Sequence, residues 1–77
     1  MKTFKPISLL VNTEANFTPS ALMRRWAKEH NKFYGNGNYF EAYIIINGKL
    51  YVYDHYEICY YDKNNDLVTL YLTEKEN

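Results

Sequence analysis

The segment YFEAYIIINGKLYVY, residues 39–53, predicts a β-hairpin and decides the fold of this chain. On both sides of its centre the side chains follow the period-two pattern of a pleated strand. Asn47-Gly48, at the centre, is the strongest short sequence signal for a two-residue type I′ turn. Such a turn also fixes the register, because it places Ile44 directly opposite Tyr51. We therefore expect an antiparallel sheet that grows outward from this hairpin.

An amphipathic helix is predicted upstream of the hairpin. Thr18 is a typical N-cap residue and Pro19 suits the first helical position. We expect the helix to continue to about Tyr34 and to end at Gly35, a residue type common just after helices. At 100° per residue one face of this helix is apolar, and it consists of Leu22, Met23, Trp26, Ala27, His30, Phe33 and Tyr34.

Three further strands are expected, over residues 2–11, 56–61 and 67–72. Pro6 favours an edge position or a bulge in the first strand, although the sequence leaves open whether that strand lies at the edge or in the middle. Residues 63–66 have turn chemistry and join the last two strands. The prediction is one α+β domain over residues 1–77: an antiparallel sheet of four to five strands, in the order β-α-β-β-β-β, with one helix packed on one face.

Tyrosine is unusually frequent, with nine copies beside four Phe and one Trp in 77 residues. Both faces of the predicted hairpin are rich in apolar groups, and one helix covers only one face. The uncovered face then offers an aromatic surface to a partner, although tyrosines also occur in half-buried sheets for their β-propensity alone. The candidate partner-binding residues on the sheet are Tyr39, Tyr43, Tyr51, Tyr53, Tyr56 and Tyr60.

The polar face of the helix is basic and forms a second candidate surface. Arg24, Lys28 and Lys32 recur every four residues, with Arg25 nearby. A row of this kind suits a phosphate backbone or an acidic protein surface, whereas the alternative is an ordinary solvated helix face. The nine basic and nine acidic residues balance, so an electrostatic partner is expected to meet a local patch rather than an overall charge.

Catalytic and metal-binding signatures are weak. His30 lies in the apolar arc, where it is either a switch or ligand contact or a core histidine bonded to a hydroxyl or carbonyl. His55 beside Asp54 and Glu57 resembles a metal cluster, but adjacent strand residues point to opposite faces unless a turn intervenes. The single Cys59 excludes an intrachain disulfide. We expect neither enzymatic activity nor a cofactor or metal; an enzyme would require a cluster of titratable groups in a pocket.

The combination of small size, one cysteine and many aromatics is similar, in composition only, to small accessory proteins of bacteriophages and mobile elements. Many of those bind and block host enzymes or immune systems. We therefore expect a cytoplasmic inhibitor that docks on a host defence protein and does not enter the membrane. The alternative is a nucleotide or nucleic-acid binder that uses Tyr or Trp stacking and Arg or Lys contacts. One form of it is an oligomeric sponge for a signalling nucleotide, and a homodimer or larger homo-oligomer suits either function.

Overall fold

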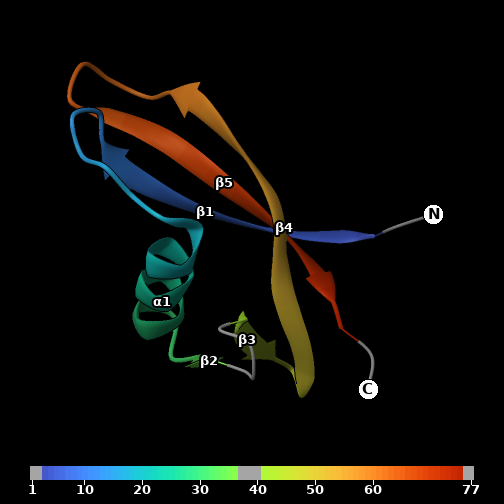
Figure 1. The fold of residues 1–77 in the computed structure, drawn as a ribbon. Coiled ribbons are helices and arrows are strands. Elements are labelled where there is room, and N and C mark those ends of the chain that lie inside the picture. The colour runs from blue at the N-terminus through green and yellow to red at the C-terminus, as the bar shows by residue number, and fades with distance from the viewer. Residues whose placement is uncertain (1–2, 37–40, 76–77) are drawn as a thin grey trace.

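The protein is an α+β domain with one five-stranded antiparallel sheet and one helix, as predicted (Figure 1). The computed structural model describes residues 3–36 and 41–75. The strand order is β1-β5-β4-β3-β2. In chain order the elements are β1 (Phe4–Asn12), α1 (Pro19–Glu29), β2 (Phe33–Asn36), β3 (Ala42–Ile46), β4 (Lys49–Tyr60) and β5 (Asn65–Glu74).

The hairpin of β3 and β4 has the predicted turn and register. Asn47 and Gly48 have φ angles of 52° and 78°, the pair of positive values that a type I′ turn requires. Ile44 lies opposite Tyr51 and Tyr43 opposite Val52. The short-range signal was sufficient here because a two-residue turn leaves no freedom in how its strands pair.

The first strand lies at one edge of the sheet, where it pairs with β5 along its whole length. The N–H of Thr13 donates to the carbonyl of Asn64 (2.9 Å), so odd-numbered residues of β1 direct their backbone groups toward β5. Pro6, an even-numbered residue, therefore lies where an N–H would point to solvent. This is the position in a sheet that tolerates proline.

The helix begins as predicted but ends earlier. Thr18 accepts a hydrogen bond from the N–H of Ala21 (3.2 Å) through Oγ1, and Pro19 follows it. The expected end at Gly35 is wrong, because α1 stops at Glu29 and Asn31 adopts a φ of 54°. The N–H of Lys32 donates to the carbonyl of Ala27 (2.8 Å), the bond that closes a Schellman motif.

The residues that follow the helix belong to the sheet instead. Phe33 and Tyr34 begin β2 and pair with Ile45 and Ile44 of β3. Their spacing after Trp26 fits a helical face, but pairing with β3 satisfies their backbone groups equally well. A long-range contact thus overrides a local pattern.

The strands expected at residues 49–53 and 56–61 are one strand in the structure. β4 runs from Lys49 to Tyr60, and its pairing with β5 changes register between Tyr53 and His55. Pairing with the ten residues of β5 keeps the chain extended across this irregularity.

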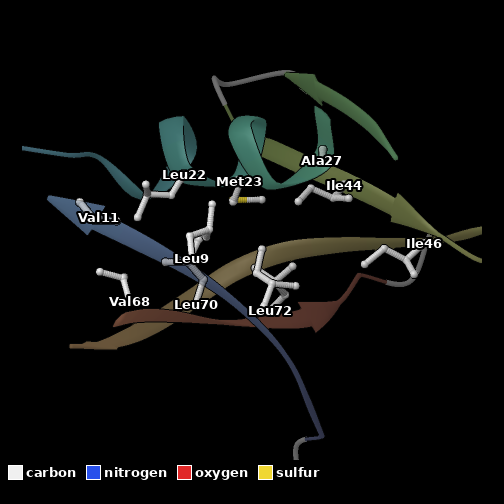
Figure 2. Close-up of a cluster of buried hydrophobic side chains, with 11 residues drawn as sticks. Leu9, Val11, Leu22, Met23, Ala27, Ile44, Ile46, Val68, Leu70 and Leu72 are labelled. Atoms are coloured by element: carbon white, nitrogen blue, oxygen red, sulfur yellow. The ribbon is translucent and has the colours of Figure 1, made fainter. Parts of the chain in front are cut away.

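The core lies between the helix and one face of the sheet (Figure 2). Leu22, Met23 and Ala27 of α1 point toward the sheet and are 4%, 0% and 1% exposed. The helix therefore covers the face that carries Ile44 and Ile46, and leaves the face of Tyr43 open. The sheet contributes Ile7, Leu9, Val11, Ile44, Ile46, Val68, Leu70 and Leu72. No helix in the described part of the chain is long and apolar enough to cross a membrane.

Candidate functional site

Three large side chains are exposed on the second half of β4. Tyr56, Ile58 and Tyr60 are 42%, 50% and 79% exposed; we call these three residues the β4 stripe. Their opposite residues in β5 include Leu70 and Val68, both fully buried. Directly opposite residues share a face, so the stripe lies on the helix-bearing face of the sheet, beyond the area that α1 covers.

A β-bulge at Asp54 sets this arrangement. Tyr53 pairs with Leu72 and His55 pairs with Tyr71, so two steps along β4 match one step along β5. Side chains alternate between faces in a regular strand, and one extra residue inverts the alternation. Without the bulge Glu57 would point toward the core face and the β4 stripe would lie on the other face.

The backbone of the β4 stripe faces an open edge. Asp62 and Asn65 exchange two hydrogen bonds (3.0 and 3.3 Å) at the end of the β4–β5 hairpin. Asn65 and every second residue after it in β5 therefore direct their backbone N–H and C=O groups toward β4. Glu57 and Cys59 lie opposite two of these residues and so form hydrogen-bonded pairs with β5. The intervening residues, the β4 stripe, direct their N–H and C=O groups away from β5.

No strand occupies that side of β4 in the part of the chain that the structure describes. β3 pairs with β4 only from Lys49 to Val52. In Figure 1 the end of β4 lies at the margin of the sheet, with β5 beside it. The β4 stripe therefore combines exposed apolar side chains with backbone groups that have no strand to pair with among residues 3–36 and 41–75.

Two further aromatic residues border the stripe. Phe17, in the connection before α1, packs edge-on against Tyr56 with ring centroids 5.5 Å apart. Tyr61, directly after β4, is 56% exposed. The sequence did not identify Ile58 and Tyr61 as surface residues, nor the partly buried Phe17 as the neighbour of Tyr56. The alternation of Tyr56, Ile58 and Tyr60 was a visible signal, but the face on which it falls depends on the bulge.

The predicted residues Tyr43, Tyr51 and Tyr53 are not part of the exposed β4 stripe. Tyr51 and Tyr53 are half-buried and pack against the core on the helix-bearing face. Partial burial, together with the nearby Tyr56 and Asp54, raises the pKa of Tyr53 above its usual value. Tyr39 lies outside the described residues. Tyr51 and Tyr53 therefore lie on the face that α1 covers, opposite the face of Tyr43.

Tyr43 lies on the open face, which is apolar near β2. Its ring lies 6.0 Å from that of Phe33, which is 51% exposed. A Cβ added at Gly35 would come within 2.6 Å of Tyr43 Cζ, so Gly35 gives the tyrosine ring room to lie across β2. This aromatic pair forms a smaller surface, separate from the β4 stripe.

The same open face carries a ring cluster around His55. His55 stacks on Tyr71 at 4.7 Å and meets Phe4 edge-on at 5.1 Å. Its Nδ1 lies 2.8 Å from Asp54 Oδ2, because the bulge brings two adjacent side chains together. The negative charge of Glu57, partial burial, and the hydrogen bond that the Tyr71 hydroxyl donates to Glu57 (3.3 Å) raise the pKa of Tyr71.

Three of the four predicted basic residues come together. Arg24 and Lys28 of α1 and Lys32 after it line a shallow hollow of about 380 Å³ beside the Tyr34–Asn36 part of β2; we call it the basic hollow. Arg25 is separate, since its Nη2 donates to the carbonyl of Leu10 in β1 and its Nε lies 3.7 Å from Glu29.

His30, the candidate switch or ligand-contacting residue, lies at the end of α1. His30 caps α1, stacks on Trp26 at 4.2 Å and has Nδ1 2.8 Å from the Trp26 carbonyl. It is exposed rather than buried, although its bond to a backbone carbonyl matches one of the two expectations. Among residues 3–36 and 41–75 no three His, Cys, Asp or Glu residues are grouped to hold a metal ion.

Comparisons with protein families, curated proteins and solved structures gave no match for this chain.

Proposed function

We propose that this protein is a non-catalytic binding module of inhibitor type, which docks on another protein through the side chains of the β4 stripe. The single observation that carries this proposal is the exposure of Tyr56, Ile58 and Tyr60 in one row at one end of the domain. Contiguous exposed apolar side chains of this size commonly mark interaction sites in small proteins.

Tyrosine suits this role for physical reasons. Its ring gives a large contact area with few rotatable bonds to immobilise, and its hydroxyl keeps a hydrogen-bond partner within reach. Phe17 supports Tyr56 from the side, so this ring is partly held in place before a partner arrives. A pre-arranged anchor loses less conformational entropy on binding.

The basic hollow adds an electrostatic element to the proposal. Arg24, Lys28 and Lys32 line it, and none of the described residues around it is acidic. Acidic groups on a partner would meet it favourably, which increases association rates more than affinity. The composition of the chain suggests a host defence protein as the target. An inhibitor of such a protein needs only to cover the surface through which that protein acts.

The proposal is tested by native capture from host cells with a matched pair of variants. Tyr56→Ala with Tyr60→Ala removes two rings of the stripe, whereas Phe33→Ala removes a ring on β2 whose exposure of 51% lies between theirs. We expect a protein captured by the wild type to be lost with the first variant and retained with the second. Circular dichroism must show both variants folded. Loss with both variants, or with neither, contradicts the assignment to the stripe.

The basic hollow also supports a second candidate, an anionic ligand such as a nucleotide or nucleic acid. Its test is the affinity for a fluorescent single-stranded oligonucleotide between roughly 50 and 200 mM salt. Binding should weaken steeply with salt and disappear in Arg24→Glu with Lys28→Glu. Lys63→Glu, in the exposed β4–β5 turn, is the matched control for the single variant Lys28→Glu, which also reverses one charge. A flat salt response excludes this reading.

A further inference from the structure

We propose that the open edge of β4 is taken by the same edge of a second copy of this chain, so that two sheets join into one across a two-fold axis. The inference deepens the proposed function and rests on it for its biological meaning. The two copies would present their β4 stripes side by side on one continuous surface.

The outer edges of the sheet are protected against strand addition, whereas the Tyr56–Tyr60 part of β4, beyond the bulge at Asp54, is not. On β1, Pro6 has no N–H to offer, and Arg25 donates to the outward-facing carbonyl of Leu10. β2 is only four residues long. Proline, long basic side chains and short length are the usual means by which proteins block edge pairing.

Residues 54–60 of β4 contain no proline and no lysine or arginine. Three residues, the β4 stripe, direct their backbone groups outward along this length. An edge of this kind is a template for another strand. The side chains along this edge then determine which strand can pair with it.

A second copy fits this edge in one register. With Ile58 on the two-fold axis, it faces its own equivalent, and each Tyr56 faces Tyr60 of the other copy. All three pairs are hydrogen-bonded pairs, because the backbone groups of these residues point outward. The apolar side chains then meet one another on the helix-bearing face.

Neighbouring registers are less favourable. Centring the axis on Glu57 places two carboxylates directly opposite each other, a destabilising arrangement. Centring the axis on Cys59 leaves only two hydrogen-bonded pairs between the stripes instead of three, since each Ile58 then faces Tyr60 of the other copy. In the proposed register Glu57 lies opposite Cys59 of the second copy, and the zero net charge of the chain adds no overall repulsion.

The contact involves one strand from each copy and is small. Interfaces below roughly 1,200 Å² belong to weak and transient complexes. We therefore expect a reversible dimer whose population depends on protein concentration. Sedimentation equilibrium of the purified chain alone, from roughly 5 to 500 µM, covers the range in which such a contact forms.

The first test compares two lysine variants of equal exposure. Ile58 and Phe33 are 50% and 51% exposed, and only Ile58 lies on the proposed axis. Ile58→Lys should weaken dimerisation by roughly tenfold or more, because two ammonium groups meet at the centre. Phe33→Lys should leave it unchanged. A wild type that stays monomeric, or equal effects of the two variants, overturns the inference.

The second test fixes the register. Glu57→Cys places a thiol opposite Cys59 of the second copy in a non-hydrogen-bonded pair, where side chains are close enough for a disulfide. Oxidised glutathione, which accepts the two electrons, should give covalent dimers of this variant on a non-reducing gel and none of the wild type. Wild-type dimers through Cys59 itself would overturn the proposed register, and so would a Glu57→Cys variant that stays monomeric.

These outcomes are separable from those of the proposed function. The dimer assays contain no partner protein, whereas native capture depends on one. A strictly monomeric chain that still captures its partner through Tyr56 and Tyr60 refutes only the self-pairing. A dimer that captures nothing refutes only the docking proposal.

Discussion

We expect that position 35 requires glycine for stability only because the ring of Tyr43 leaves no room there for a Cβ. A Cβ at position 35 would lie 2.6 Å from both Cζ and the hydroxyl oxygen of Tyr43, well inside the 3.5–4.0 Å at which atoms attract. The ring is the far end of a rotatable side chain, so we expect a clash at the lower end of the 1–3 kcal/mol typical of overpacking, about 1.5 kcal/mol. Alanine in place of glycine in a strand returns about 0.5–1 kcal/mol.

The sign of the effect should therefore depend on residue 43. Gly35→Ala alone should destabilise the fold by about 0.5–1 kcal/mol, whereas in a Tyr43→Ala background it should stabilise it by about 0.5–1 kcal/mol. The coupling energy between the two positions is then about 1–2 kcal/mol, within the range seen for residues in contact.

The assay is urea unfolding of the four chains in this double-mutant cycle, followed by the fluorescence of the single Trp26. All four should unfold with similar m-values, so that midpoints report stability. Equal destabilisation by Gly35→Ala in both backgrounds would refute the reasoning, since it would show that the β2 backbone, rather than the Tyr43 ring, requires glycine.

Thr18→Ala should cost about 1 kcal/mol in urea unfolding, because it removes the side-chain acceptor that caps the N–H of Ala21; Thr18→Ser should retain most of the stability. Leu70→Ala should cost about 2–5 kcal/mol, since Leu70 is fully buried, and an effect below about 1 kcal/mol would contradict the core described above. The pKa of Tyr71 is raised in the folded protein, so its contribution to stability is intact below about pH 10 and is lost as the pH rises through the folded value. Glu57→Gln should make this alkaline loss shallower, as measured by unfolding at successive pH values, and an unchanged slope would show that the charge of Glu57 is not its cause.

Part of the candidate site was predictable from residue type. Tyr56 and Tyr60 were named for their tyrosine rings, and Arg24, Lys28 and Lys32 for their spacing. Both groups do lie at the surface. Tyr51 and Tyr53 were named on the same grounds and are instead packed against the core. Composition identifies side chains suited to binding, but it does not say which of them the core requires.

Local chemistry alone determined two features of this fold and narrowed a third. Asn47-Gly48 fixed the hairpin and its register, since these residue types readily adopt the positive φ angles of its turn. Thr18-Pro19 fixed the start of α1, because the cap acts within one turn of the chain. Pro6 favoured an edge position or a bulge without deciding between them, because a missing N–H is harmless only where it would face solvent.

Tertiary structure decided the rest, because those features depend on strands that meet from distant parts of the chain. Pairing with β3 took Phe33 and Tyr34 out of the predicted helix and into β2. Pairing with β5 merged two predicted strands and placed the bulge at Asp54. One extra residue exchanges the faces of every side chain after it, so the position of the β4 stripe follows from a long-range register that no local pattern encodes.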